Sequence, residues 1–158
     1  MRDPRIPSLD DADRALLRLV QRDATLTADA LGRHLGLSPS QAGRRRARLE
    51  AAGLIRGYEA RLEPRPLGLT VQAFVQVEMA SHAPARAGAF LALCRAQPAI
   101  VSVWTLTGEA DYLLRVWCAD LAALNELIHG VLLPHDAVAR VRSQIVMDQP
   151  KRDGPLPL

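Results

Sequence analysis

Four arginines lie within five consecutive positions of this 158-residue chain, and they are the residues best suited to binding an anion. They are Arg44, Arg45, Arg46 and Arg48. A guanidinium group offers a planar fork of donors that matches a phosphate group or the edge of a guanine base. The cluster therefore indicates contact with nucleic acid. The competing interpretation is a charged surface helix that only faces solvent.

The residues just before the cluster predict how it is positioned. Gly36 allows a tight turn after a short helix, and Ser38 can cap the free amides of the next helix. Gln41 can complete a capping box, and Pro39 occupies the first helical position, where a missing N–H costs nothing. A short helix, a glycine turn and a capped basic helix are typical of a helix-turn-helix, whose second helix enters the DNA major groove.

A second group of candidate residues is the acidic pair Glu109 and Asp111, in the segment 108–111. Two carboxylates can serve acid–base catalysis, but no His or Cys neighbours them in the sequence, so no nucleophile is paired with a base. We predict no catalytic residues and keep an enzyme or a small-molecule carrier as the alternative function. Taken alone, the Gly and Asp of this segment favour an ordinary hairpin turn.

Cysteine and histidine usage gives no sign of a metal or redox site. Cys94 and Cys118 lie far apart in apolar surroundings, which predicts buried core thiols. The four histidines are scattered without ligand spacing. We therefore predict neither a metal nor a cofactor.

Charge is unevenly distributed along the chain. Residues 1–68 contain 13 Arg against 9 Asp and Glu, a net charge of +4, whereas residues 69–158 contain 7 Lys and Arg against 8 Asp and Glu, a net charge of −1. A basic half attracts phosphate, and a nearly neutral half needs another role. No stretch approaches the ~20 apolar residues of a membrane span and no signal peptide is visible, so we expect a cytoplasmic protein with no membrane partner.

The N-terminal half has the pattern of three helices, expected at residues 11–22, 28–34 and 39–52. Asp10 and Thr27 are the predicted caps of the first two helices. Arg46 falls on the inward face of the third helix, where we expect its stem to pack and its head to stay partly exposed.

The pattern changes after the third helix. Gly53 is the expected helix stop, and the alternation that follows predicts a strand ending near Leu62. Residues 1–62 would thus form a DNA-binding domain that includes this strand. The Pro- and Gly-rich segment 63–69 predicts a hinge.

The C-terminal half, residues 70–150, alternates between strand and helix patterns in the order β-α-β-β-α-β, which predicts a ferredoxin-like fold. Its second helix is expected to bury Leu121, Leu124, Ile128 and Val131. One sheet face carries Phe74 and Trp104 and needs a partner, most simply a second copy of the chain. Residues 151–158 are expected to form a loose tail.

Three stretches resemble the Lrp/AsnC (leucine-responsive/asparagine-synthesis) family of transcriptional regulators. They are the Leu-Asp-x-x-Asp pattern that opens residues 9–17, the turn and basic helix with its flanks at residues 35–58, and the glycine-acid-x-aspartate-tyrosine motif within residues 107–116. The likeness spans roughly residues 9–151. The occurrence of all three motifs in this order and at this spacing is highly specific for the family.

The resemblance implies an α+β protein with an N-terminal winged-type helix-turn-helix and a C-terminal ferredoxin-like (RAM-type) sensor domain. It also implies homodimers that assemble further, into an octamer-like ring. An amino acid or related small molecule would bind between dimers as effector. The chain would then be a sequence-specific regulator of double-stranded DNA whose assembly or DNA affinity responds to that effector.

Site residues follow from the same resemblance. The residues that would face DNA are Ser38, Ser40, Gln41, Arg44, Arg45 and Arg48. Those that would line or shape the effector site are Thr107, Gly108, Glu109, Ala110, Asp111 and Tyr112.

Overall fold

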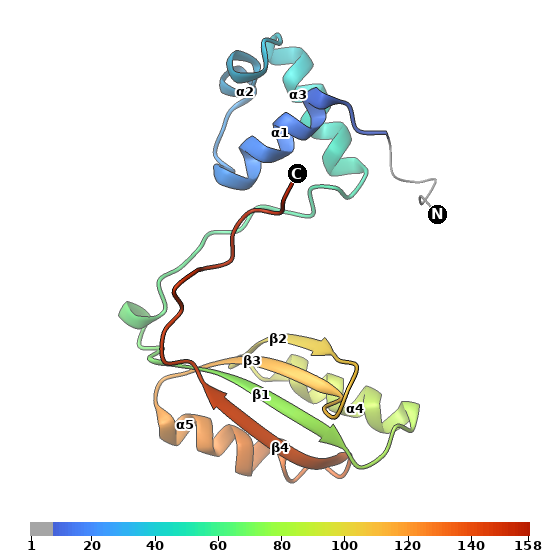
Figure 1. Cartoon of the computed structure of the whole chain (residues 1–158), viewed down its shortest axis with the longest axis vertical. Helices are drawn as coiled ribbons and strands as arrows, with labels where there is room; N and C mark the ends of the chain where they lie inside the picture. The colour runs from blue at the N-terminus through green and yellow to red at the C-terminus, as the bar shows by residue number, and fades with distance from the viewer. Residues whose placement is uncertain (1–7) are drawn as a thin grey trace. The chain divides into compact units, whose positions relative to one another are not determined.

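The computed structural model describes residues 8–158 and divides the chain into two compact units. The first unit consists of the chain up to Arg61 together with Lys151–Leu158, and the second is Leu62–Pro150. Figure 1 shows the helices of the first unit in blue to cyan, and the sheet of the second unit with the helices that cover it in green to red. Each unit has a hydrophobic core of its own.

The first unit is built from three helices, α1 (Asp11–Arg22), α2 (Ala28–Leu35) and α3 (Pro39–Ala51). These bounds agree with the sequence-based expectation to within one residue at each end. The core between the helices consists of the buried side chains Leu16, Leu17, Val20, Leu31, Ala42 and Leu49.

The predicted caps and turn are confirmed. The Ser38 Oγ accepts from the Gln41 amide at 3.2 Å while the Gln41 side chain accepts from the Ser38 amide at 2.9 Å, which completes the capping box. Gly36 adopts a left-handed conformation with φ of 65°. A Cβ on Gly32 would lie 2.7 Å from the Leu37 carbonyl oxygen, so the turn packs directly against the backbone of α2.

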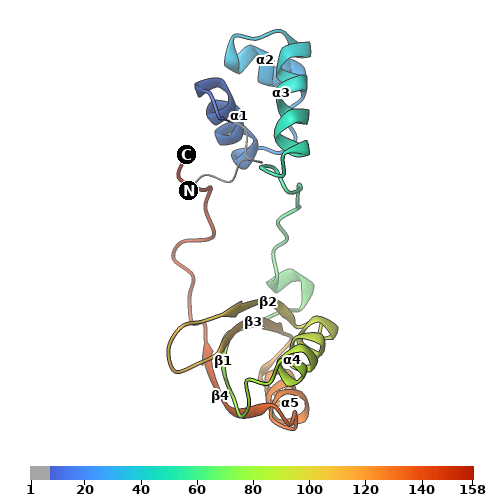
Figure 2. The same cartoon turned by 90° about the vertical axis from the view of Figure 1, so that its right-hand side faces the viewer.

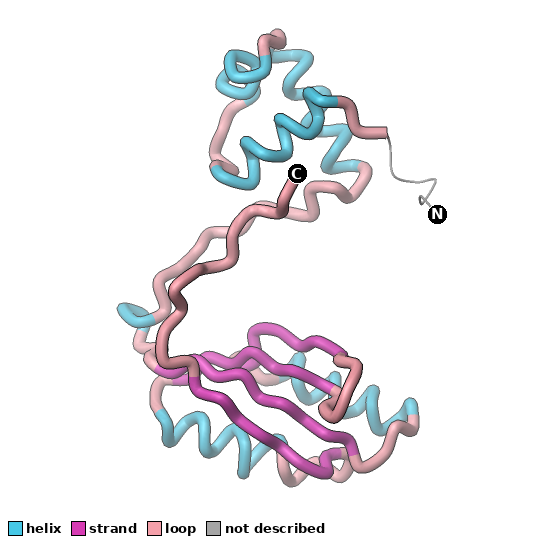
Figure 3. The backbone as a smooth tube through the Cα atoms, in the orientation of Figure 1, coloured by secondary structure: helices cyan, strands magenta, loops and turns pink. Residues whose placement is uncertain are grey.

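The expectation of a strand that ends near Leu62 is wrong. Within the described residues, the chain after α3 is extended but pairs with no strand (Figure 3). Tyr58, the first residue of the expected alternation, instead binds back to α3: its hydroxyl donates to Glu50 at 2.7 Å and accepts from Arg46 at 2.8 Å. A strand needs a ladder partner, and this side chain is held by the helix instead. The predicted hinge holds one 3-10 turn, Arg65–Leu67.

Residues 151–158, expected to form a loose tail, contain no helix or strand and are exposed along their whole length. These residues return to the first unit and bond to α1. The Leu156 amide donates to the Gln21 Oε1 at 2.6 Å, and Arg18 donates to the Leu158 carbonyl at 3.2 Å. Prolines suggested a free tail, but carbonyls flanking them still accept hydrogen bonds from polar side chains.

The second unit is a four-stranded antiparallel sheet in the order β2-β3-β1-β4, which confirms the ferredoxin-like arrangement. Figure 2 shows its two helices on the same face of the sheet. The elements in chain order are β1 (Val71–Met79), α4 (Pro84–Ala96), β2 (Ile100–Thr105), β3 (Tyr112–Cys118), α5 (Leu121–Glu126), the π-helical η2 (Leu127–Leu132) and β4 (Val138–Ile145).

The core of the second unit lies between the sheet and these helices. Val75 and Val77 of β1 and Leu114 of β3 are fully buried against Phe90 of α4. Cys94 is buried as predicted, and burial raises the pKa of its thiol to about 11, which keeps it protonated and unreactive. No group of side chains with metal-ligand spacing occurs among the described residues.

One face of the second helix was predicted wrongly. Leu121 is 59% exposed, whereas Leu127 and Leu132 are buried. The reason is the switch from α-helix to π-helix at Leu127, because the wider turn brings residues five apart onto one face.

No helix of the described chain is both long and apolar enough to span a bilayer.

Candidate functional sites

The outer face of α3 presents polar and basic side chains to solvent. Ser38, Ser40, Gln41 and Arg44 are exposed, while Ala42 and Leu49 anchor the opposite face in the core. Because the capping box fixes the first turn of the helix, the exposed side chains project from a rigid support. These four of the six predicted DNA-facing residues share one open surface near the start of α3.

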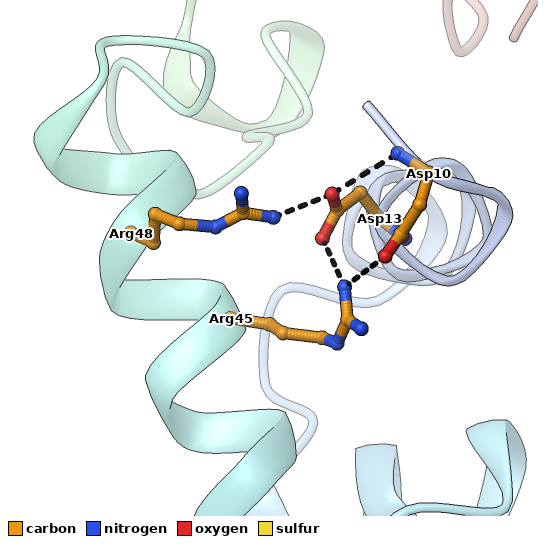
Figure 4. A network of polar contacts seen from close by, with 4 residues as sticks. All are labelled: Asp10, Asp13, Arg45 and Arg48. Atoms are coloured by element: carbon orange, nitrogen blue, oxygen red, sulfur yellow. Dashed lines mark hydrogen bonds and ion pairs between the residues drawn. The ribbon is translucent and has the colours of Figure 1, made fainter. Parts of the chain in front are cut away.

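Two further predicted residues, Arg45 and Arg48, form ion pairs with α1 (Figure 4). The Arg45 Nη1 donates to the Asp13 Oδ1 at 2.8 Å and to the Asp10 Oδ2 at 2.7 Å. The Arg48 Nη2 donates to the Asp13 Oδ2 at 2.5 Å. The helix expected to face DNA is thus held to α1 through its own arginines.

Asp13 is the centre of this network. Its side chain is only 1% exposed, and its Oδ2 also accepts from the Asp10 amide at 3.2 Å as part of the α1 capping box. Burial by itself would raise the pKa of Asp13, but the hydrogen bonds from Arg48 and Arg45 outweigh it and hold the pKa below its usual value. Asp13 therefore stays ionised at neutral pH.

A hollow of about 430 Å³ lies beside this network, on the surface of the first unit. It is lined by Asp10, Leu37, Gln41, Arg44, Arg45 and Arg48. Three guanidinium groups thus face one concavity together with a single lining carboxylate. Such a surface favours an anionic ligand.

Arg46, the inward arginine of α3, is only partly exposed, as expected. Its Nη1 donates to the Leu26 carbonyl at 2.8 Å, and its guanidinium lies 4.5 Å from the centre of the Tyr58 ring. Tyr58 and Arg46 both bond Glu50, and these bonds hold the pKa of Glu50 below its usual value. Arg46 therefore supports the domain and does not present its charge to a ligand.

In the second unit, the loop between β2 and β3 is closed by Asp111. The Asp111 Oδ2 accepts from the Met79 amide at 2.7 Å, at the bulge where the register of β1 against β4 shifts. The Asp111 amide donates to the Val77 carbonyl at 3.0 Å. Gly108 has φ of 125°, which favours glycine. Asp111 thus ties the loop to the end of the neighbouring strand.

The other loop carboxylate, Glu109, faces the opposite edge of the sheet. Its Oε2 lies 3.4 Å from the Arg142 Nη1 of β4, and Arg142 also lies 3.5 Å from Glu78 of β1. Glu109 is strongly exposed and Arg142 half-exposed. The loop therefore places a carboxylate and a guanidinium side by side at the surface.

The six predicted effector residues differ in exposure. Thr107, Gly108 and Glu109 are exposed, and Ala110 and Asp111 are half-buried. Tyr112 is buried in the core, with its ring centre 5.2 Å from that of Phe90, so it shapes the base of the loop.

Sequence reasoning missed Asp10 and Asp13 as partners of the arginines, and it missed Arg142 at the loop. The sequence predicts Asp10 only as the cap of the first helix, and Asp13 enters only as part of the Leu-Asp-x-x-Asp pattern. Arg140 and Arg142 stand two apart on a strand, a spacing that puts them on one face and was an available signal. Their partner Glu78 became apparent only from the strand register.

Comparison with known proteins gives a consistent result for both units. Residues 9–56 match a family model described as winged helix-turn-helix DNA-binding, and residues 72–156 match one described as the Lrp/AsnC ligand binding domain. Together the two matches cover most of the chain.

Individual relatives match along nearly the whole length. The chain is 33% identical to the DNA-binding transcriptional activator DecR of Escherichia coli K12, over 95% of this chain and 99% of that protein. It is 33% identical to a leucine-responsive regulatory protein of Rhizobium meliloti, over 90% of this chain and 92% of that protein. A transcriptional regulator from Neisseria meningitidis, solved as a complex with L-Met, superposes with a TM-score of 0.91 at 35% identity, covering 95% of this chain and 97% of that one.

Proposed function

Because this chain belongs to the Lrp/AsnC family of DNA-binding transcriptional regulators, we propose that the outer face of α3 enters the major groove of its operator. In this arrangement Ser40, Gln41 and Arg44 contact base edges. Ser38 contacts a backbone phosphate. Arg45 and Arg48 contribute at the border of this surface, where α1 holds them. We place this activity in the cytoplasm.

The observation that carries the proposal is the exposure of Gln41 and Arg44 on the first turns of a capped helix. Recognition helices contact base edges with residues near their N-terminus. An arginine can bind the O6 and N7 atoms of guanine, and a glutamine can bind adenine, through paired hydrogen bonds. Further along the helix, Ala42 and Leu49 pack in the core and Arg46 bonds to Tyr58 and to the Leu26 carbonyl.

Arg44→Ala is expected to weaken specific DNA binding by roughly 1–3 kcal/mol, the range for losing a good base or phosphate contact. The measurement is a titration of labelled DNA from upstream of the protein's own gene, with random duplex as competitor. Arg86→Ala removes the same charge from an exposed position of α4 and serves as the control. Unchanged binding by both Arg44→Ala and Arg45→Ala, with the fold intact, would contradict the assignment.

The second unit, we propose, binds an amino acid at the loop between β2 and β3. The ammonium group of a zwitterion fits the exposed Glu109 carboxylate, and its carboxylate fits the adjacent Arg142 guanidinium. The loop amides that follow Gly108 offer further donors to the carboxylate. The complex of the Neisseria meningitidis regulator with L-Met supports this chemical class.

Glu109→Gln is expected to abolish the rise in melting temperature that an amino-acid ligand gives the wild type. The measurement is thermal melting with each of the twenty amino acids, on this variant and on Asp111→Asn. Asparagine keeps an acceptor for the Met79 amide, so it removes the Asp111 charge without opening the loop. Glu59→Gln, at an exposed site of the first unit, controls for charge. A wild-type response in both loop variants would place the site elsewhere.

The uncovered face of the sheet supports the proposal that the chain forms a homodimer. We propose that such dimers assemble further into an octamer. Trp104 on this face is 42% exposed, and Phe74 and Leu113 lie on the same side by strand register. An apolar patch of this kind is typically covered by a partner. A ligand that binds one assembly state better than another would shift that assembly and with it the DNA affinity.

A further inference from the structure

The hollow beside α3 is lined by guanidinium groups whose two carboxylate partners differ strongly in exposure. Arg44, Arg45 and Arg48 line it. The Asp13 side chain is 1% exposed, whereas that of Asp10 is 52% exposed. Solvent anions can therefore compete for the contact between Arg45 and Asp10, while the contact between Arg45 and Asp13 is shielded.

We propose that this hollow is a seat for one phosphodiester group of the DNA backbone, and that Asp10 competes with that phosphate for Arg45. The inference rests on the proposed DNA-binding function and adds a site to it. Asp10 is then an internal competitor, which weakens binding to any duplex and leaves base selection to the start of α3.

The geometry allows this exchange without disrupting the fold. Within the described residues, Arg45 bonds the two aspartates through Nη1, which leaves Nε and Nη2 for another acceptor. The Asp10 Oδ1 accepts from the Asp13 amide at 2.7 Å, so the cap of α1 holds the carboxylate in place while Arg45 turns toward the phosphate. Asp13 keeps Arg45 and Arg48 near the hollow throughout.

The charges around the hollow explain why Asp10 matters. Three arginines line the hollow, and their charges are offset by Asp10 at its surface and by the buried Asp13 behind it, so one net positive charge remains, and removing Asp10 would leave two. A phosphate that meets two uncompensated positive charges is held more strongly than one that lies near a carboxylate bonded to the same guanidinium group. The gain is independent of DNA sequence, because phosphates carry no sequence information.

The test is Asp10→Asn, since asparagine caps a helix as well as aspartate and removes only the charge. We expect about fivefold tighter binding to both random and upstream duplex, in keeping with an exposed ion pair. The dependence of log K on log salt should steepen by up to about one. Asp11→Asn is the matched control, because Asp11 is the next residue, is exposed and does not line the hollow. Asp10→Ser, also a capping residue, guards against a folding artefact.

The outcomes separate the two proposals. If the wild type binds no duplex, the proposed function fails and the phosphate seat with it. If the wild type binds duplex but Asp10→Asn and Asp11→Asn behave alike, the seat is overturned and the function stands. A further measurement uses inorganic phosphate as a competitor of random duplex. If phosphate displaces the duplex no more strongly than chloride does at equal ionic strength, the result supports a DNA phosphate as the occupant of the hollow. Clearly stronger competition would assign the hollow to a free anion and overturn DNA as its occupant.

Discussion

Asp13→Asn is expected to lower the free energy of unfolding of the first unit by about 2–3 kcal/mol. Removing one member of a buried ion pair costs about 3–5 kcal/mol, and the figure is reduced here because Arg45 and Arg48 are 29% and 46% exposed and regain water. Urea denaturation followed by helical circular dichroism measures the loss. Asp29→Asn breaks an exposed pair with Arg33 one helical turn away and should cost at most about 0.5 kcal/mol. Equal losses in the two variants would contradict the central role of Asp13.

The same substitution gives a pH dependence of defined sign. The pKa of Asp13 is lower in the folded state than its ordinary value near 3.9, so the ionised carboxylate favours folding. The stability difference between wild type and Asp13→Asn should therefore be constant from neutral pH down to about pH 5. It should shrink as the pH falls below about 4 and Asp13 takes up a proton. A difference that grows on acidification would contradict the ion-pair account.

Trp104→Asp is expected to weaken self-association at least about 100-fold, because a buried Trp at an interface centre often contributes 2 kcal/mol or more and a charge there must be desolvated. Light scattering at micromolar concentration should report a monomer for the variant and a dimer or larger assembly for the wild type. Leu121→Asp places the same charge on an exposed leucine of the helical face and should leave the assembly intact. A monomeric wild type would refute the proposed interface.

Local signals in the sequence predicted the elements well. Each of the three N-terminal helices begins with a capping side chain, and Asp10, Thr27 and Ser38 all cap as expected. The alternation of β1 placed Val75 and Val77 correctly in the core. These signals depend on residues within a few positions of each other, which is why they can be recognised without a structure.

The failures involve contacts between distant residues or a change of helical pitch. Arg45 and Arg48 meet Asp13 across more than thirty residues, and no spacing rule connects them. The same holds for Asp111, which resembles a simple turn residue until the sheet brings the Met79 amide to its carboxylate. Leu121 was misplaced because a π-helical turn follows it and shifts the buried face, whereas periodicity assumes one pitch.

The return of residues 151–158 to the first unit means that two peptide segments, not one, connect the sensor to the DNA-binding part of each chain. Two covalent connections restrict the rotation of one unit about the other more than a single connection does. Cutting the chain once, in either connecting segment, would remove this restriction and leave the two units joined by a single segment.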